Sequence, residues 1–475
     1  MKMGFAVFIL SVLLLYPSCF AQVQENFFGL HHNKYRQGEP WPTVPFGVLR
    51  TVSGLVKWAD LESCPGGSDP KNSCYHWGRN PAGGDLDKLV NGANEHHEEV
   101  MFSIHATPDW LSTRGSRCRG AGVPDKNCLG PTDNECGTRA IGSCDPPYDL
   151  DAVVGSGEGD GPDKMFKDFV TAAATRYGKK IKYWELWNET SNILMANPKY
   201  WTPKQWARLS KDLHDVVKSI DPDAIVLGAN ICRCTPPGSA KFEPWTEDYF
   251  SALDKYGPSV VDGIGYHGYA NPPERALEFV NTLKRKMNDH VSTRNKPIYN
   301  TESAWPGNHQ LFKADQTPDW DARSAWLARA NILTAALGAK TFIFFGWDLG
   351  PNSGSMWFPE RTFGCTIPNK NGEPGFLCPT ALAYEQIRSW LLGAVFEKEC
   401  SAKDQSSGRL WTCDFTKNNG SYRGRFVWYD GDGSTTNYTP EKQFAGKKDL
   451  DGSTAALKPN SAIAVGKAPV LLEAK

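Results

Sequence analysis

Two short segments of the chain each end in a glutamate that could do acid–base or nucleophilic chemistry. One is 183–190 (YWELWNET), which carries Glu189, and the other is 297–303 (PIYNTES), which carries Glu302. Each is an apolar or aromatic run that closes on a carboxylate, which is typical of a buried strand that delivers one side chain to the edge of a sheet. Two carboxylates across a cleft can cleave a glycosidic bond, because one protonates the leaving oxygen while the other attacks the anomeric carbon or activates water. The pair therefore predicts glycosidase chemistry.

The elements that must position these carboxylates alternate between strand and helix. Alternating strands and helices favour a parallel α/β architecture, and eight such units fit a closed (β/α)8 TIM barrel with its active site at the C-terminal ends of the strands. Glu189 and Glu302 end the fourth and seventh predicted strands, where that architecture places its chemistry. The predicted strands are 26–31, 46–52, 99–105, 181–189, 224–230, 261–267, 297–302 and 340–348, and the predicted helices are 161–177, 202–220, 273–287 and 321–337.

The pattern changes after a further predicted helix at 380–392. Residues 396–475 show short alternating runs separated by Gly, Asp and Asn, which is typical of a small β-sandwich. Trp411, Trp428 and Tyr429 could bind carbohydrate there. Aromatic residues in short strands belong mostly to the core, however, so we predict a structural side domain. The expected boundaries are 22–395 for the barrel and 396–475 for the sandwich.

The N-terminus resembles an export signal. Residues 1–21 combine Lys2, a 13-residue apolar stretch and the small Ala21 at the expected cut, so we predict a cleaved signal peptide and a secreted or extracytoplasmic protein. Lipidation of Cys19 is a weaker alternative. The apolar stretch is too short for a bilayer, which needs ~20 residues, so no membrane anchorage is expected. Lys+Arg 52 against Asp+Glu 53 argues against a nucleic-acid partner.

Twelve cysteines remain after the predicted signal peptide, and an even count in an exported chain favours disulfides over metal. We expect the closely spaced pairs to bridge single loops or hairpins. No second C-x-x-C or histidine pair accompanies Cys232 and Cys234, so no zinc site is expected. The expected disulfides are Cys64–Cys74, Cys365–Cys378 and Cys400–Cys413, and the pairing of Cys118, Cys128, Cys136, Cys144, Cys232 and Cys234 stays open.

The long segment 111–163 follows the third predicted strand and should shape the substrate cleft. It ends in an acidic stretch that could bind calcium, but the ligand spacing of an EF-hand is missing, so we expect a solvated acidic loop. The acidic residues concerned are Asp149, Asp151, Glu158, Asp160 and Asp163.

Trp-Asn-Glu at 187–189 resembles the acid/base motif of glycoside hydrolase clan A, a large clan of retaining enzymes built on (β/α)8 barrels. Within that clan the chain is most similar to family 39 glycoside hydrolases and their relatives, through 26–31 (NFFGLH), 105–110 (HATPDW) and 181–189. The resemblance spans most of residues 25–395. It implies that Glu189 is the acid/base, Glu302 the nucleophile and Asn188 the ligand of the sugar 2-hydroxyl.

The resemblance also suggests residues that would adjust the charge of the nucleophile or bind the sugar. The clan commonly keeps an arginine beside the nucleophile, and Arg50 would favour the ionised carboxylate there. The segment 266–269 resembles the clan's His-x-Tyr, with His267 lining the site and Tyr269 donating to the nucleophile. Trp347 would form the aromatic floor under the sugar in subsite −1.

Two further side chains are expected to bind substrate. Trp305 would rim the pocket of the nucleophile, and His105, at the end of the third predicted strand, could bind sugar hydroxyls. Strand alternation would place Glu185 and Glu189 on one face, with Glu185 deeper and held by a cation.

The mechanism implied is double displacement, with Glu302 stabilised as an anion and Glu189 raised toward neutrality by burial and neighbouring charge. No metal or cofactor is needed. Two alternatives use the same barrel: a polysaccharide-binding protein without catalysis, which the presence of both glutamates disfavours, and a transglycosylase with the same residues. The sugar, the linkage, exo or endo action and the oligomeric state stay open.

Overall fold

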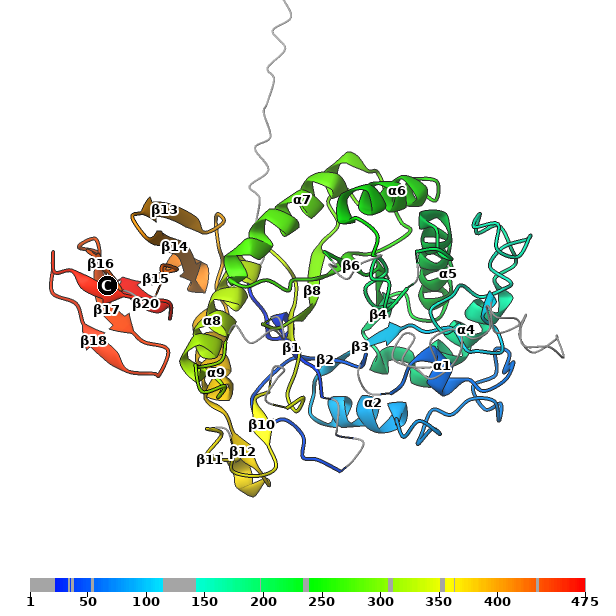
Figure 1. The fold of residues 1–475 in the computed structure, drawn as a ribbon, viewed down its shortest axis with the longest axis horizontal. Helices are drawn as coiled ribbons and strands as arrows, with labels where there is room; N and C mark the ends of the chain where they lie inside the picture. The colour runs from blue at the N-terminus through cyan, green and yellow to red at the C-terminus, as the bar shows by residue number, and fades with distance from the viewer. Residues whose placement is uncertain are drawn as a thin grey trace, which may run out of the picture.

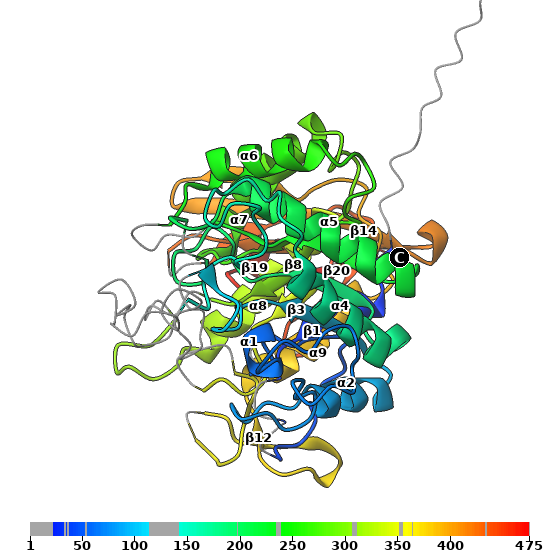
Figure 2. The same ribbon diagram turned by 90° about the vertical axis from the view of Figure 1, so that its right-hand side faces the viewer.

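The structure is a computed structural model (Figure 1). It describes residues 22–474, with the exception of 33–34, 36–37, 53–54, 114–141, 197, 234–238, 306–310, 351–354, 363 and 433–434. The predicted signal peptide, 1–21, lies outside the described residues. The described chain consists of a helix-covered parallel barrel and a β-rich C-terminal domain beside helices α8 and α9 (Figures 1 and 2).

The barrel sheet contains each of the eight predicted strands; seven are shorter than predicted, and the strand predicted at 297–302 is shifted by one residue. Its hydrogen-bonded order is β5-β4-β3-β2-β1-β9-β8-β7-β6, and all its pairings are parallel. Only Asn230 separates β5 from β6, and Leu227 bridges to Gly263 just before β7, so the two ends of the sheet meet and the barrel closes. The strands are β1 (Phe28–Leu30), β2 (Val48–Arg50), β3 (Glu99–Ile104), β4 (Tyr183–Leu186), β5 (Ile225–Ala229), β6 (Ile231–Cys232), β7 (Ile264–His267), β8 (Ile298–Ser303) and β9 (Phe342–Phe344).

The barrel has two apolar environments. A compact cluster contains one inward-facing side chain from each of six strands, and a larger cluster lies between strands and helices. Such layers of large side chains fill the interior of a TIM barrel and make it a packed core instead of a pore. The interior cluster consists of Val48, Met101, Tyr183, Leu227, Tyr299 and Ile343.

The five predicted helices are confirmed within a few residues. A capping box explains why the helix at 203–220 begins where it does. The Thr202 side chain accepts a hydrogen bond from the Gln205 N–H, the Gln205 side-chain oxygen accepts one from the Thr202 N–H, and Pro203 occupies the first helical position. In the described part of the chain, no helix combines the length and apolarity needed to cross a membrane. The helices are α1 (Trp58–Leu61), α2 (Leu86–Glu95), α4 (Lys164–Tyr177), α5 (Pro203–Ile220), α6 (Phe242–Asp254), α7 (Ala276–Asp289), α8 (Trp320–Ala336) and α9 (Pro379–Leu391), of which α1, α2 and α6 were not predicted.

The three predicted disulfides Cys64–Cys74, Cys365–Cys378 and Cys400–Cys413 are confirmed. The second pins a small antiparallel sheet, β10 (Trp357–Phe358), β12 (Phe376–Leu377) and β11 (Ile367–Pro368), to the start of α9. Cys144 and Cys232 are also disulfide-bonded. The remaining cysteines, Cys118, Cys128, Cys136 and Cys234, lie outside the described residues.

The C-terminal domain contains a six-stranded antiparallel sheet with buried residues on both of its faces. One face packs with a two-stranded sheet around a core that includes Val427 and Tyr429, and the other joins the barrel cluster through residues such as Trp428. The sheet order is β13-β14-β15-β20-β17-β18, and β16 pairs with β19. The strands are β13 (Ser401–Gln405), β14 (Gly408–Lys417), β15 (Tyr422–Tyr429), β16 (Thr436–Tyr438), β17 (Phe444–Lys448), β18 (Thr454–Ala456), β19 (Ile463–Val465) and β20 (Val470–Ala474).

This packing decides the role of the aromatic residues in that domain. Trp411, Trp428 and Tyr429 are 4%, 0% and 2% exposed. A ring without an exposed face cannot stack on a sugar, so the three residues are structural, as predicted. Only Tyr429 lies in the domain's own core, whereas Trp411 and Trp428 belong to the cluster shared with the barrel.

The acidic stretch before α4 is a solvated loop only in part, because Glu158 and Asp160 are exposed as expected and the other three acidic residues are not. Asp149, Asp151 and Asp163 are buried, and Asp151 accepts bonds from two backbone N–H groups of the loop, those of Gly157 and Gly159. Asp163 lies beside Asp212 of α5. Burial first, and the Asp212 carboxylate second, raise the pKa of Asp163 well above its ordinary value, although Arg208 opposes them.

We expect Asp163→Asn to stabilise the protein at neutral and alkaline pH. A carboxyl group whose pKa is higher in the folded than in the unfolded state contributes its full stabilisation of the fold at pH values below its unfolded-state pKa. That stability is lost as pH rises through the folded pKa, by about 1.4 kcal/mol for each pH unit that separates the two pKa values. An asparagine keeps a donor toward Asp212 without ionising. Urea unfolding at pH 5 and pH 8 should show a gain for the variant at pH 8 that shrinks at pH 5. The exposed Asp248→Asn is the matched control, and an equal effect of pH on both variants would contradict the prediction.

Candidate functional site

Glu302 lies at the C-terminal end of β8, and both of its oxygens accept short hydrogen bonds. Tyr269 donates its hydroxyl to Oε1 at 2.7 Å, and Arg50 donates NH1 to Oε2 at 2.7 Å. The carboxylate is only 7% exposed. Burial and the Glu302 charge raise the pKa of Tyr269 well above its ordinary value, so its hydroxyl keeps its proton and remains a donor.

Arg50, at the end of β2, ties three side chains together. Its Nε donates to Glu185 at 2.7 Å, NH1 donates to Glu302, and NH2 donates to Asn188 Oδ1 at 3.0 Å. Burial alone would lower the pKa of Arg50, but Glu185 and Glu302 outweigh it and raise the pKa. The expected cation beside Glu302 and the expected buried Glu185 held by a cation are therefore the same guanidinium.

The chain leaves the strand pattern before it reaches Glu189. β4 ends at Leu186, and Trp187 and Glu189 have positive φ angles, +64° and +48°. Such angles are uncommon outside glycine and redirect side chains. The predicted alternation up to Glu189 is therefore wrong: the Trp187 ring packs outside the barrel, against Trp201 and Trp206.

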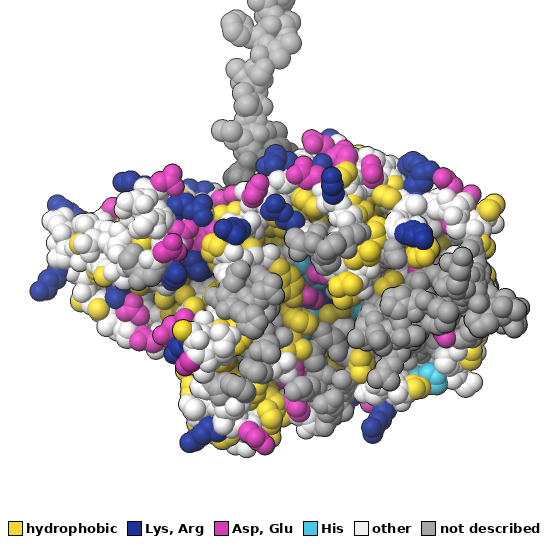
Figure 3. All heavy atoms as spheres, in the orientation of Figure 1, with side chains coloured by type: hydrophobic (Ala, Val, Ile, Leu, Met, Phe, Trp, Pro, Cys, Tyr) yellow, Lys and Arg dark blue, Asp and Glu magenta, His cyan; other side chains and the backbone are white. Residues whose placement is uncertain are grey.

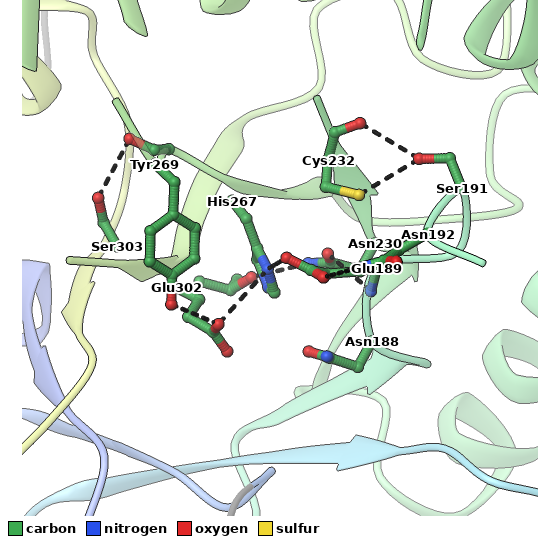
Figure 4. Close-up of polar contacts among 12 residues, drawn as sticks. Asn188, Glu189, Ser191, Asn192, Asn230, Cys232, His267, Tyr269, Glu302 and Ser303 are labelled. Carbon is green, nitrogen blue, oxygen red and sulfur yellow. Dashed lines mark hydrogen bonds and ion pairs between the residues drawn. The ribbon is translucent and has the colours of Figure 1, made fainter. Parts of the chain in front are cut away.

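This turn carries Glu189 to the side of the site opposite Glu302. Its Oε1 lies 2.9 Å from His267 Nδ1, Asn192 donates to its Oε2 at 2.6 Å, and its backbone N–H donates to Asn230 Oδ1 at 3.3 Å. One oxygen of Glu189, one oxygen of Glu302 and a ring nitrogen of His267 all lie within 4.8 Å of one another. Figure 4 shows His267 between the two carboxylates, with the Tyr269 hydroxyl on Glu302.

The charge state of Glu189 differs from the expectation. Burial does favour the neutral form, as predicted, but hydrogen bonds from His267 and Asn192 and the charge of Arg50 outweigh it, and they lower the pKa of Glu189. The expected rise is therefore wrong for the unliganded site.

Two asparagines that were not predicted as site residues hold Glu189 in place. Asn192 follows it by three residues, and Asn230 occupies the break between β5 and β6. Besides accepting from the Glu189 N–H, Asn230 donates Nδ2 to Glu185 Oε1 and to Thr301 Oγ1, both at 2.9 Å. Asn230 could have been recognised in the sequence, because it is the polar residue that ends the predicted strand 224–230.

His31 is a further buried side chain at the nucleophile. Its Nε2 lies 3.9 Å from Glu302 Oε2, and its ring is 0% exposed. Burial, together with the charges of Arg50 and His267, lowers the pKa of His31 well below its ordinary value, so the imidazole is neutral. It adds a polar group beside Glu302 without adding positive charge.

Three other predicted site residues have no hydrogen bond to either glutamate within the described residues. Trp347 is 0% exposed and stacks on Trp357 with ring centroids 6.4 Å apart. Trp305 is buried beside the Arg323 guanidinium. His105 is buried at the end of β3, and burial lowers its pKa. Because the Trp347 ring has no exposed face, the structure gives no support to its predicted role as the floor under the sugar. The roles of Trp305 and His105 in substrate binding stay predictions.

The convergence of Glu189, His267 and Glu302 could also hold a metal ion, and within the described residues no other group of acidic, His and Cys side chains converges in this way. Arg50 already places a positive charge 2.7 Å from Glu302. Two carboxylates on either side of one small space also suit chemistry on a single bond without an ion. Figure 3 shows acidic and histidine side chains at the bottom of a hollow that hydrophobic side chains surround.

Comparisons with known proteins agree on the fold. No family model matches the chain, and no curated protein matches it by sequence. Among solved structures, a family 39 glycoside hydrolase from Bacteroides cellulosilyticus is similar with a TM-score of 0.60 and 14% identity over 95% of this chain and 81% of that one.

Two further structures are similar over nearly the whole of both chains. An α-L-arabinofuranosidase from Thermotoga maritima has a TM-score of 0.56 and 11% identity, over 96% of this chain and 98% of the other. A glucosidase from Croceicoccus marinus has a TM-score of 0.56 and 12% identity, over 95% and 96%. At these identities the likeness establishes the fold alone, and that fold is the one expected from the resemblance to clan A glycoside hydrolases.

Proposed function

We propose that this protein is a retaining glycoside hydrolase, with Glu302 as nucleophile and Glu189 as acid/base. The observation that carries the proposal is the approach of a Glu189 oxygen and a Glu302 oxygen to within 4.8 Å across the barrel mouth. Retaining pairs lie about 5–5.5 Å apart, whereas inverting pairs lie roughly 6.5–9.5 Å apart and leave room for a water. The short separation favours direct attack by a carboxylate on the sugar.

In the first step, Glu302 attacks the anomeric carbon and the bond to the leaving oxygen breaks, while a proton passes from Glu189 to that oxygen. Arg50 and Tyr269 hold both Glu302 oxygens and so aim the carboxylate. His267 Nδ1 lies 2.9 Å from Glu189 Oε1, within hydrogen-bond distance of the carboxyl group that donates this proton.

In the second step, a water attacks the glycosyl-enzyme ester, and Glu189 accepts the proton of that water while Glu302 leaves as a carboxylate. The lowered pKa of Glu189 suits a group that is ionised once its proton has gone. Formation of the ester removes the Glu302 charge, which further favours the ionised form of Glu189.

The proposed substrate is a carbohydrate, and the site residues do not select one sugar. Asn188 lies beside Arg50, which donates to its amide oxygen at 3.0 Å, so its Nδ2 group is directed elsewhere and can donate to a sugar hydroxyl. The structural neighbours include enzymes named for arabinofuranosides and glucosides. We propose that the protein acts outside the cytoplasm, because the disulfides Cys64–Cys74, Cys365–Cys378 and Cys400–Cys413 suit an oxidising compartment.

The proposal predicts net retention of anomeric configuration. A panel of aryl glycosides and polysaccharides would first find a substrate, and proton NMR of the first-formed sugar would then identify its anomer before mutarotation. We expect the anomer of the substrate, and methanol should be glycosylated with the same configuration because it can intercept the ester. The opposite anomer would remove Glu302 from the role of nucleophile.

A further inference from the structure

Glu274 is a buried carboxylate in the segment that also carries Tyr269. The segment leaves β7 after His267, passes Tyr269 and forms the 3-10 turn η4 (Pro273–Arg275). Glu274 is only 4% exposed. Burying a carboxylate costs several kcal/mol unless it is paired and hydrogen-bonded, so its partners show what holds this segment in place.

The partners of Glu274 come from the barrel and from the C-terminal domain. Arg329 of α8 donates NH1 to Glu274 Oε1 at 3.0 Å, and Trp428 of β15 donates Nε1 to the same oxygen at 2.8 Å. Arg329 and Trp428 are 5% and 0% exposed. A charge-assisted bond from the C-terminal domain therefore ends on the segment that follows β7.

Trp428 and its neighbour in the sheet, Trp411, donate their indole N–H groups to different domains. The rings of Trp411 and Trp428 lie parallel, with centroids 5.8 Å apart. The indole of Trp411 donates within its own domain, to Asp430 at 2.9 Å, whereas that of Trp428 donates to the barrel. The pair thus provides a natural comparison between an internal and an interdomain hydrogen bond.

The same segment determines the position of Tyr269. Trp326 of α8 donates Nε1 to Ala270 O at 2.8 Å. The backbone that follows Tyr269 is therefore held at Ala270 by α8 and at Glu274 by Trp428 of the C-terminal domain. Tyr269 itself is 36% exposed and donates to Glu302 at 2.7 Å. The Tyr269 ring meets the His267 ring edge to face, with centroids 6.3 Å apart, and the backbone of residues 268–275 carries the tyrosine to that position.

We propose that Glu274 and Trp428 form an interdomain latch that positions Tyr269 against Glu302, so that the C-terminal domain is part of the catalytic apparatus. Glu274 and Trp428 are positioning residues, because neither touches the reacting atoms. The inference rests on the proposed function, since it assigns a purpose to the bond between Tyr269 and Glu302.

The test compares Trp428→Phe with Trp411→Phe, which each remove one indole N–H and keep an aromatic ring. A small displacement at a reacting centre can cost up to about 100-fold in rate. We expect Trp428→Phe to lower kcat on the order of ten-fold with little change in KM, and Trp411→Phe to leave kcat within about two-fold. Glu274→Gln, which keeps an acceptor for Trp428, should fall between them.

A double-mutant cycle with Tyr269→Phe separates positioning from general destabilisation. If the latch acts through Tyr269, Trp428→Phe should cost much less in the Tyr269→Phe background than in the wild type. Equal losses in both backgrounds, or equal kcat for Trp428→Phe and Trp411→Phe, would overturn the latch.

Amide hydrogen exchange gives a readout that does not depend on activity. Residues 268–275 should exchange faster in Trp428→Phe than in Trp411→Phe, and unchanged exchange would also overturn the latch. A wild-type protein without glycosidase activity, but with the expected exchange, would instead refute the proposed function and leave the latch intact as a structural contact.

Discussion

Glu302→Gly is expected to abolish turnover of aryl glycosides, with a loss in kcat on the order of 10⁴–10⁶-fold, the range seen when a nucleophile is removed. The reason is covalent: without the carboxylate no glycosyl-enzyme ester can form. Azide should restore part of the rate, because a small anion can occupy the space that the side chain vacates between Tyr269 and Arg50. The product should be a glycosyl azide of inverted configuration, since only one displacement occurs.

The control for this variant is Glu360→Gly, which removes an exposed carboxylate and should keep full activity. Circular dichroism and thermal unfolding of both variants would exclude misfolding, which matters because Arg50 loses one of its two carboxylate partners. Unchanged activity of Glu302→Gly without azide would exclude Glu302 as the nucleophile.

Glu189→Ala is expected to slow substrates with poor leaving groups far more than nitrophenyl glycosides. General acid catalysis contributes typically 10²–10⁴-fold, and a good leaving group departs without a proton. Initial rates across aryl glycosides of increasing phenol pKa should therefore show a steep dependence that the wild type lacks. Glu397→Ala, at an exposed position, should behave as the wild type.

Azide separates the roles of the two carboxylates by stereochemistry. In Glu189→Ala the ester on Glu302 still forms, and azide should attack it in place of activated water, which yields a glycosyl azide of retained configuration. The anomer produced by this variant is thus opposite to that from Glu302→Gly. The same anomer from both variants, or an equal loss across all leaving groups, would show that Glu189 only supports binding or folding.

Local patterns in the chain were sufficient to predict the barrel. All eight strands and five helices follow from apolar periodicity and turn residues, which act over a few residues and need no partner to be recognised. The helices α1 (Trp58–Leu61), α2 (Leu86–Glu95) and α6 (Phe242–Asp254) were missed. The three short-range disulfides were predictable for the same reason, because cysteines 10 or 13 residues apart can meet within one loop.

The C-terminal domain shows where local patterns stop. Its strands carry apolar residues on both faces, and the sequence alone does not say what covers each face. The structure assigns Val427 and Tyr429 to the core between its own sheets and Trp428 to the barrel. The hydrogen bond from Trp428 to Glu274 joins positions 154 residues apart, and no local pattern reports such a pair.

The barrel and the two glutamates at its rim were predictable from the amino-acid sequence, because apolar periodicity marks each strand and polar residues mark its end. The charge state and orientation of those carboxylates were not predictable in this way. The positive φ angles at Trp187 and Glu189, the Arg50 guanidinium shared by Glu185 and Glu302, and the bonds that lower the pKa of Glu189 all depend on side chains brought together from different strands. Electrostatic interactions act through distance in space, and distance along the chain does not reveal it.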